Sequence, residues 1–325
     1  MITVGVDIGG TKIAAAAVDE RGTVVARARR DTPEEHATAI LHSVAEMVRE
    51  LSAGPEVEAA GAVGAVGVAA AGFVDSARST VVFAPNLPWR DEPLRDLLQA
   101  EVDLPVVIEN DANAAAWGEF RFGAGREADD MVLVTIGTGI GGGVVSDGAL
   151  LRGGYGMAAE IGHLRVVPGG LLCGCGNRGC WEQYGSGSAL TRRARELAAS
   201  EPQRHAALLE RAGGDPAKVE GEMVTAAAAA GDEAAAELMT SFGTEFGETL
   251  ASLVAVLDPE LVVVGGGASQ AGELLLHPIR QGFGSELMGR GHRPQAPVIA
   301  ARLGNDAGMI GAADLARDVL PRGSA

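Results

Sequence analysis

The chain has 325 residues, of which 47% are hydrophobic, and this length is sufficient for two domains with separate cores. Its formal net charge of −17 argues against nucleic acid and anionic membrane surfaces as partners. The N-terminus runs straight into a strand pattern without a basic segment, so no signal peptide is expected, and the weakly apolar run from Ala59 to Val74 falls short of a membrane-spanning helix. These features predict a cytoplasmic globular protein.

The chain opens with three predicted strands, at residues 2–8, 13–18 and 23–28, which form a β-meander. Its first turn is Gly9-Gly10-Thr11-Lys12. This is not a Walker A loop, because the motif differs and a strand follows in place of a helix. Backbone N–H groups, a hydroxyl and an ammonium in one turn suit a phosphate, although a glycine pair is also common in plain hairpin turns.

The next segment contains a predicted amphipathic helix from Glu34 to Leu51 and a buried strand at 63–70 that ends at Gly72. The loop that follows includes two prolines and is expected to be irregular. In it, Asn86 and Trp89 suit a sugar, because sugar rings stack on aromatic side chains. A purely structural loop explains the same residues equally well.

A predicted strand from Pro105 to Ile108 is followed by Asn110 and Asp111, and then by a helix from Ala114 to Phe122. An Asn or Asp at this position is a routine helix cap. The carboxyl end of a strand in an α/β sheet is also where ligands bind. Taken alone, the stretch favours capping.

A second glycine-rich turn follows the predicted strand from Met131 to Ile136. Gly137, Gly139 and Gly142 satisfy the dinucleotide pattern G-x-G-x-x-G, but a strand pattern follows where that site needs a helix. We therefore predict a second phosphate-facing hairpin, which repeats the arrangement at the N-terminus.

All three cysteines lie within eight positions, close after a histidine. The resulting set is His163, Cys173, Cys175 and Cys180. Three thiolates and one imidazole are the donors and the ligand count of a tetrahedral zinc site. Four protein ligands leave no open position, so the zinc is expected to be structural, and it would hold Glu160 and Glu182 near one another. Carboxylates there suit a polyhydroxylated ligand, since they accept hydrogen bonds from hydroxyls.

The remaining chain alternates helices and strands. The predicted elements are a helix at Ser188–Ala199, a polar segment at 200–221, a helical region at Glu222–Leu257 broken near Gly231, a strand at Glu260–Val264, a helix from Gly272 to about Gly282, a strand at Pro297–Leu303 and a closing helix at Asp306–Leu320. The turn Gly265-Gly266-Gly267 is a third turn that could bind an anion, because it precedes a helix N-terminus.

Five motifs together resemble the ROK family of sugar kinases and repressors, and most of all its bacterial glucokinases. In chain order they are Asp7-x-Gly-Gly-Thr-Lys12, Glu109-Asn-Asp-Ala-Asn113, Gly137-Thr-Gly-Ile-Gly-Gly-Gly143, Glu160-Ile-Gly-His163 and Cys173-x-Cys-Gly-x-x-Gly-Cys-x-Glu182. The resemblance covers nearly the whole chain, and its cysteine motif is the most specific part.

The resemblance implies an α/β protein with the actin-like ATPase (ribonuclease H-like) fold, in which two α/β domains flank a cleft. We expect a smaller domain from residues 1–109 and 303–325. The larger domain, residues 110–302, would carry the zinc motif.

The resemblance further implies an ATP-dependent glucokinase in which Asp111 is the general base on the sugar's 6-hydroxyl. The expected sugar-binding residues are Gly72, Asn86, Asn110, Asp111, Glu160, His163 and Glu182. The expected ATP-binding residues are Asp7, Gly9, Gly10, Thr11, Lys12, Gly137, Thr138, Gly139, Gly265, Gly266 and Gly267. Mg²⁺ would accompany ATP near Asp7, and His163 would give one ring nitrogen to zinc and the other to a sugar hydroxyl. The family also suggests a homo-oligomer, a dimer or a tetramer.

Three alternatives stay open. Another sugar kinase of the same chemistry would act on an N-acetylhexosamine, on fructose, or on mannose with polyphosphate as donor. A sugar-responsive transcription factor of this family would carry an N-terminal DNA-binding domain, which is not expected here because the first strand begins at residue 2. The last alternative is a zinc-stabilised sugar-binding module without catalysis.

Overall fold

The computed structural model of the chain describes residues 1–33 and 36–320 and divides into two compact units. The first comprises residues 1–129, 143–159 and the segment from 302 onward. The second comprises Asp130–Gly142 and Glu160–Ala301. The chain therefore passes between the units four times.

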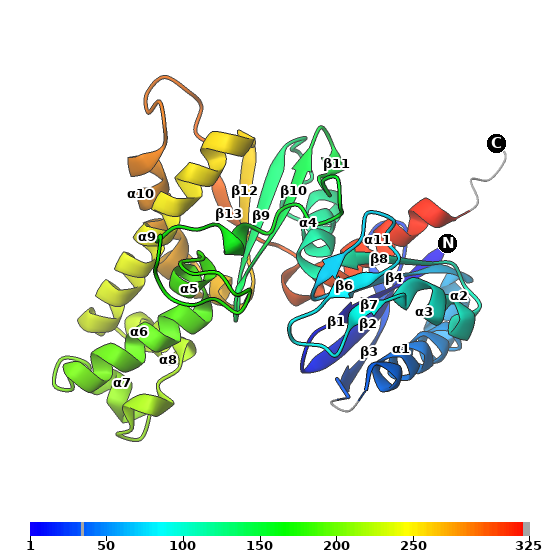
Figure 1. Cartoon of the computed structure of the whole chain (residues 1–325), viewed down its shortest axis with the longest axis horizontal. Helices are drawn as coiled ribbons and strands as arrows, with labels where there is room; N and C mark the ends of the chain where they lie inside the picture. The colour runs from blue at the N-terminus through cyan, green and yellow to red at the C-terminus, as the bar shows by residue number, and fades with distance from the viewer. Residues whose placement is uncertain (34–35, 321–325) are drawn as a thin grey trace. The chain divides into compact units, whose positions relative to one another are not determined.

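The first unit is built on a five-stranded sheet (Figure 1). Its order is β3 (Val24–Asp31), β2 (Lys12–Val18), β1 (Ile2–Ile8), β4 (Val63–Ala70) and β8 (Val106–Asn110). The predicted meander is confirmed, since β2 is antiparallel to both β1 and β3, whereas β1, β4 and β8 are parallel. Asp7, Ala70 and Asn110 consequently end neighbouring strands at one edge of the sheet.

Helices cover both faces of this sheet. One face packs on α1 (Ala37–Ser52) and α3 (Leu94–Val102) around an apolar core. The buried face of α1 is the one that the sequence predicts, while residues 34–35, where the predicted helix starts, lie outside the described residues. A short helix α2 (Pro55–Ala60) and a small sheet of β5 (Phe73–Val74), β6 (Val81–Phe83) and β7 (Arg90–Glu92) complete this side.

The other face packs on α11 (Ala307–Leu315), which crosses α4 (Asp111–Phe122) at very close range (Figure 1). A Cβ at Gly118 would lie 2.4 Å from the carbonyl oxygen of Ala307, and one at Gly311 would lie 1.8 Å from that of Ala114. Only glycines permit this approach. Because α4 is bound to α11 in this way, it belongs to the first unit, as do residues 143–159. The expected division, with residues 110–302 in the second domain, differs from the observed one for this reason.

The second five-stranded sheet has the order β11 (Ala149–Leu150), β10 (Ile140–Ser146), β9 (Met131–Ile136), β12 (Leu261–Gly265) and β13 (Val298–Ala300). β9, β12 and β13 are parallel. The helices of the second unit are α5 (Glu182–Gly185), α6 (Gly187–Ser200), α7 (Ala206–Arg211), α8 (Gly221–Ala229), α9 (Glu233–Leu257) and α10 (Glu273–Glu286). The helical break near Gly231 is confirmed, and the 200–221 segment contains α7, which the sequence did not indicate.

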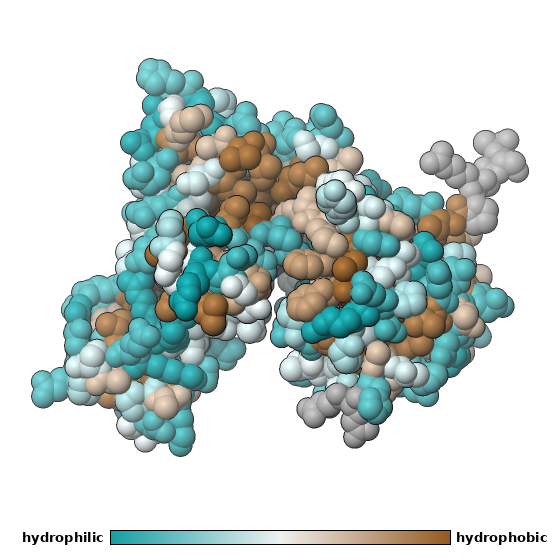
Figure 2. Space-filling view, viewed as in Figure 1, coloured by the Kyte–Doolittle hydropathy of each residue, from teal (hydrophilic) through white to brown (hydrophobic). Residues whose placement is uncertain are grey.

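Short 3₁₀ helices complete the fold: η1 (Ile161–His163), η2 (Pro216–Lys218), η3 (Gly267–Ala271), η4 (Gly304–Asp306) and η5 (Ala316–Val319). The predicted closing helix thus ends at Leu315 and continues as η5. Hydrophilic side chains cover much of the α6–α8 region (Figure 2), in keeping with the excess of acidic residues. Within the described part of the chain, no helix is both long and apolar enough to cross a membrane.

Candidate functional site

The turn from β8 into α4 carries the predicted base. Asn110 is the N-cap of α4: its Oδ1 accepts a hydrogen bond from the N–H of Asn113 at 3.0 Å, and its Nδ2 donates to the carbonyl of Gly72 at 3.1 Å. Asp111 is the first residue of the helix, and its Oδ1 accepts from the N–H of Ala112 at 2.9 Å. Capping, the simpler interpretation of this stretch, therefore applies to Asn110 and leaves Asp111 for another role.

A second carboxylate, Asp7 at the end of β1, lies near Asp111. Burial raises the pKa of Asp7 to about 7, and the negative charge of Asp111 adds to the rise. Burial also raises the pKa of Asp111, although its hydrogen bond from Ala112 acts in the opposite direction. Gly308, in the first turn of α11, lies against the Asp7 carboxylate, since a Cβ at this position would be 3.1 Å from Oδ2 of Asp7. Two carboxylates with raised pKa values at one sheet edge form a site for a proton or a cation.

The first glycine-rich turn lies beside Asp7. The N–H of Gly9 donates to the carbonyl of Lys12 at 3.0 Å, and Oγ1 of Thr32 donates to the carbonyl of Gly9 at 2.7 Å. Gly10, Thr11 and Lys12 are exposed. The turn is thus fixed by its own backbone while its predicted phosphate-binding groups face solvent.

The loop after β6 supplies Asn86 but not the tryptophan. Asn86 is exposed and next to the first turn, because a Cβ at Gly10 would lie 3.2 Å from the Cβ of Asn86. Trp89 is fully buried in the core of the first unit, so the hypothesis that it stacks on a sugar is wrong. Gly72 is held between Asn110 and the loop, where a Cβ would lie 2.5 Å from the carbonyl oxygen of Phe83. The first unit therefore brings its predicted site residues to one edge of its sheet.

In the second unit, the two remaining glycine turns lie side by side. Thr135 of β9 pairs with Gly265 of β12, so the turns that follow these parallel strands share an edge. A Cβ at Gly266, where φ is +81°, would lie 2.5 Å from the carbonyl oxygen of Ile136. β10 follows the Gly137–Gly139 turn, which confirms that this is a hairpin rather than a dinucleotide site. The Gly265–Gly267 turn leads into η3, and α10 then begins at Glu273 with Gly272 as its N-cap, which agrees with the helix start predicted at Gly272.

The predicted zinc ligands lie together. The ligand atoms of His163, Cys173, Cys175 and Cys180 are all within 4.8 Å of one another. Sγ of Cys173 is 3.6 Å from Nδ1 of His163, and Sγ of Cys175 is 3.6 Å from Sγ of Cys180. A tetrahedral zinc with bonds of about 2.0–2.3 Å separates its ligand atoms by roughly 3.3–3.8 Å. The described cysteines are all free. The donor set and its spacing therefore fit a zinc ion.

The loop that carries these cysteines can turn this tightly because of its glycines. Gly176 and Gly179 have φ values of +89° and +81°. A Cβ at Gly179 would lie 1.7 Å from the carbonyl oxygen of Val167, a distance that excludes other residues. The local sequence thus imposes the geometry of the metal-ligand set.

Two carboxylates accompany the ligand set. Oε1 of Glu182 accepts from Sγ of Cys173 at 2.9 Å and lies 3.9 Å from Nδ1 of His163. Burial, with this bond to Glu182, raises the pKa of the Cys173 thiol. Glu182 also reaches the Gly137–Gly139 turn, since a Cβ at Gly139 would lie 2.8 Å from its Oε2. Glu160 directly precedes η1, where its carbonyl accepts from the N–H of His163 at 3.1 Å.

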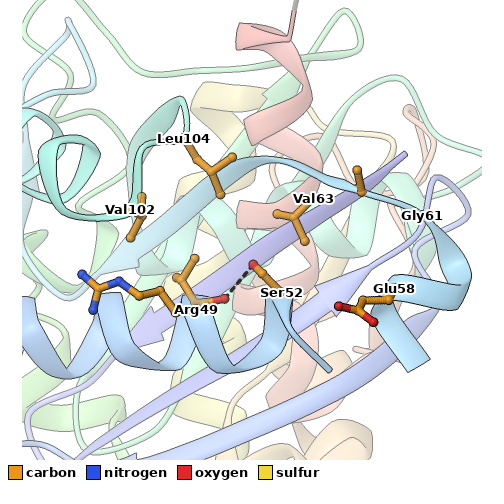
Figure 3. Close-up of a pocket in the computed structure, with 9 residues that line it drawn as sticks. Arg49, Ser52, Glu58, Gly61, Val63, Val102 and Leu104 are labelled. Carbon is orange, nitrogen blue, oxygen red and sulfur yellow. Dashed lines mark hydrogen bonds between the residues drawn. The ribbon is translucent and has the colours of Figure 1, made fainter. Parts of the chain in front are cut away.

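Figure 3 shows a surface pocket of about 510 Å³ in another part of the first unit. It lies at the amino end of β4, where Val63, Val102 and Leu104 line it together with Arg49 and Glu58 (Figure 3). The candidate site begins at the opposite end of the same strand. Among the described residues, the lining of this pocket includes no predicted site residue.

The family model described as "ROK family" matches residues 3–319. The chain belongs to the ROK family. A glucokinase from Streptomyces coelicolor is 48% identical over 98% of this chain and 99% of its own length, and a Thermotoga maritima glucokinase is 37% identical over 97% of both. A solved ROK family glucokinase from Streptomyces griseus, in complex with glucose and AMPPNP, matches with a TM-score of 0.88 and 50% identity over 98% of this chain and 100% of its own.

This ROK membership and the structural match confirm the expected α/β fold of the actin-like ATPase type with two α/β domains. Sequence reasoning missed some residues around the site. Glu109 belongs to the Glu109–Asn113 motif, which gives it no role of its own, and it is buried beneath the Asn110–Asp111 turn. Arg152, which binds Glu109, had no local signal, because its neighbours in sequence form an ordinary glycine-containing loop.

Proposed function

We propose that this protein is an ATP-dependent glucokinase, which transfers the γ-phosphate of ATP to the 6-hydroxyl of glucose and gives glucose 6-phosphate and ADP. The observation that carries the proposal is the full-length match to the S. griseus glucokinase whose structure contains glucose and AMPPNP. The carboxylate pair of Asp7 and Asp111 and the three glycine turns are consistent with that chemistry.

Asp111 is the proposed general base. A general base accepts the proton of the attacking hydroxyl, and the raised pKa of Asp111 increases its affinity for that proton. Asn110 fixes the helix start and Gly72 fixes Asn110, so the carboxylate is presented from a rigid helix terminus. Phosphoryl transfer depends mainly on such positioning, together with stabilisation of charge.

The second unit is proposed to bind sugar hydroxyls through Glu160, His163 and Glu182. Zinc would hold Nδ1 of His163, because this atom is the one that faces Cys173, and would leave Nε2 for a hydroxyl. The zinc itself is proposed to be structural, since four protein ligands complete its coordination. The backbone N–H groups of the glycine turns at 9–12, 137–139 and 265–267 would bind the phosphates of ATP.

The residues present also fit Mg²⁺. Mg²⁺ in kinases is bound by one or two carboxylates and the substrate phosphates, and Asp7 offers one such carboxylate beside the first glycine turn. When bound, Mg²⁺ neutralises charge that develops on the transferring phosphate. Asp7 would hold it from the end of β1.

We further propose that the enzyme acts in the cytoplasm, where ATP is present and a reducing environment keeps cysteine thiols available to zinc. The expected homo-oligomer, a dimer or a tetramer, is tested by light scattering coupled to size-exclusion chromatography. Nucleic acid and membranes are not expected as partners because of the net charge of −17.

The proposal is tested by a coupled ADP-release assay with Mg-ATP and five sugars: glucose, mannose, fructose, N-acetylglucosamine and N-acetylmannosamine. We expect glucose to lead in kcat/KM by at least about tenfold, a difference of about 1.4 kcal/mol in transition-state binding. A lead for another sugar would keep the mechanism and refute the specificity. No turnover with any sugar, with either ATP or polyphosphate as donor, would refute the proposal.

A further inference from the structure

The turn that carries Asp111 rests on a buried carboxylate to which the proposed mechanism gives no role. Glu109 is 2% exposed, and it precedes Asn110 at the end of β8. Its Oε1 accepts from the backbone N–H of Asn110 and from Nδ2 of Asn113, each at 3.2 Å. One oxygen of Glu109 therefore binds both sides of the turn that presents Asp111.

The other oxygen of Glu109 accepts a hydrogen bond from one arginine and lies at ion-pair distance from a second, both from elsewhere in the first unit. Oε2 of Glu109 is 2.7 Å from Nε of Arg152 and 3.5 Å from Nε of Arg78. Arg78 lies in the turn between β5 and β6, and Arg152 follows β11. A buried carboxylate requires such partners, and removal of one of them leaves an uncompensated charge.

Arg152 also closes the loop in which it lies. Its carbonyl accepts from the N–H of Ala158 at 3.0 Å. Gly156, where φ is +86°, seats this loop on the first unit, because a Cβ there would lie 2.5 Å from the carbonyl oxygen of Val74. Glu160, a proposed sugar ligand, follows Ala158 by two residues. Arg152 is therefore tied to the base turn by its side chain and to the far end of the 152–158 loop by its backbone.

We infer that Glu109 and Arg152 form a positioning pair for the proposed phosphoryl transfer, which fixes the Asp111 turn relative to the 152–158 loop. Neither residue touches a reacting atom in this inference; both act through Asn110, Asn113 and the loop. The inference rests on the proposed function. Its expected signature is a loss of turnover without a loss of ATP binding, because the pair contacts the base turn and not the glycine turns.

The test compares Arg152→Met, Arg152→Lys, Glu109→Gln and the double variant Glu109→Gln/Arg152→Met with the wild type. Assays are run at 15 °C, and circular dichroism establishes that each variant is fully folded at that temperature. We expect kcat for glucose to fall about tenfold to 10²-fold in Arg152→Met, since displacement of a reacting group by about 1 Å can cost 10²-fold. The KM for ATP stays within about twofold, because uniform ATP binding is unaffected.

Three further readouts separate positioning from stability alone. The acid limb of the kcat/KM profile shifts in Arg152→Met, because the hydrogen bonds around Asp111 change. Arg152→Lys recovers part of kcat, since it returns a positive charge without the planar Nε donor. The double variant loses no more than about threefold beyond the worse single variant, because the two side chains act as one unit.

Asp314→Asn is the matched control. Asp314 is also a buried acid of the first unit, 8% exposed, and it binds Trp117 and Arg121 rather than the Asp111 turn. We expect this variant to lower Tm while kcat and the pH profile at 15 °C stay those of the wild type. Three results would overturn the inference. The first is wild-type turnover by folded Arg152→Met, and the second is a double variant in which the effects of the single variants simply multiply. The third is a loss of kcat that follows the loss of Tm equally in Asp314→Asn. If the wild type itself phosphorylates no sugar, it is the proposed function that fails.

Discussion

Replacement of Asp111 by Asn is the most direct test of the mechanism. The substitution preserves the shape of the side chain, and an amide oxygen can still accept the N–H of Ala112, which Oδ1 of Asp111 accepts at 2.9 Å. The start of α4 is held separately by the cap from Asn110, so the fold is expected to survive. What the amide cannot do is take a proton.

The size of the effect follows from that loss. A general base contributes about 10²–10⁴-fold to the rate, which corresponds to about 2.7–5.4 kcal/mol of activation free energy. We expect kcat of Asp111→Asn to fall by at least about 10²-fold. In the wild type, kcat/KM should rise with pH as Asp111 loses its proton, over a range above the ordinary aspartate value of 3.8 because burial raises the pKa of Asp111.

The assay is ADP release with glucose and Mg-ATP, and isothermal titration calorimetry measures glucose binding. We expect the glucose Kd to change little, since Glu160, His163 and Glu182 are retained. Asp232→Asn is a matched control: Asp232 caps α9 through the N–H of Ala235 at 2.8 Å, and Asn caps equally well. Turnover of Asp111→Asn close to that of the wild type would refute the assignment of the base.

Three further predictions concern stability and metal content. The pKa of Asp7 is raised from 3.8 to about 7, so the folded state binds its proton more tightly and loses stability as pH rises from about 4 to 7. Asp7→Asn should therefore raise the free energy of unfolding at pH 8 by up to a few kcal/mol, and give little gain at pH 4. An equal gain at both pH values would contradict this. Purified protein should contain one zinc ion per chain by mass spectrometry. The Cys175→Ser variant should contain no zinc and have a lower Tm, whereas Arg178→Ala in the same loop should retain the zinc. Zinc retained by Cys175→Ser would refute the ligand set. Glu119 is fully buried and accepts hydrogen bonds from the backbone N–H groups of residues 124, 302 and 303. Glu119→Gln should therefore lower the free energy of unfolding in urea by about 2–4 kcal/mol, against less than about 0.5 kcal/mol for the same change at exposed Glu196. Equal losses in the two variants would contradict the role of Glu119.

Much of the candidate site could be predicted because its motifs are local. The spacing of Cys173, Cys175 and Cys180 with intervening glycines dictates a tight loop whatever the surrounding fold, and the three sulfur atoms and His163 lie together as expected. The strand patterns that flank the glycine turns at 9–12 and 137–139 predict hairpins, and both turns are hairpins in the structure. In these cases backbone geometry within a few residues decides the outcome.

Other features were decided by contacts between distant segments. Trp89 suits a sugar in its sequence context, yet it is fully buried in the apolar core to which α1, α3 and the first sheet contribute. The membership of α4 in the first unit depends on glycines of α4 and α11 that allow the two helices to touch. No local pattern distinguishes such a glycine from a flexible one.

The order of residues along the chain dictates the chemical groups of the site: which residues offer carboxylates, thiolates and backbone N–H groups, and in which turns. How these groups are supported depends on contacts that form only in the folded protein. Glu109 and Arg152 are 43 residues apart, and they meet because β8 and the loop after β11 pack in the same unit. Tertiary packing determines which residue pairs with a buried charge, because an unpaired buried charge destabilises the whole folded state and not only its own segment.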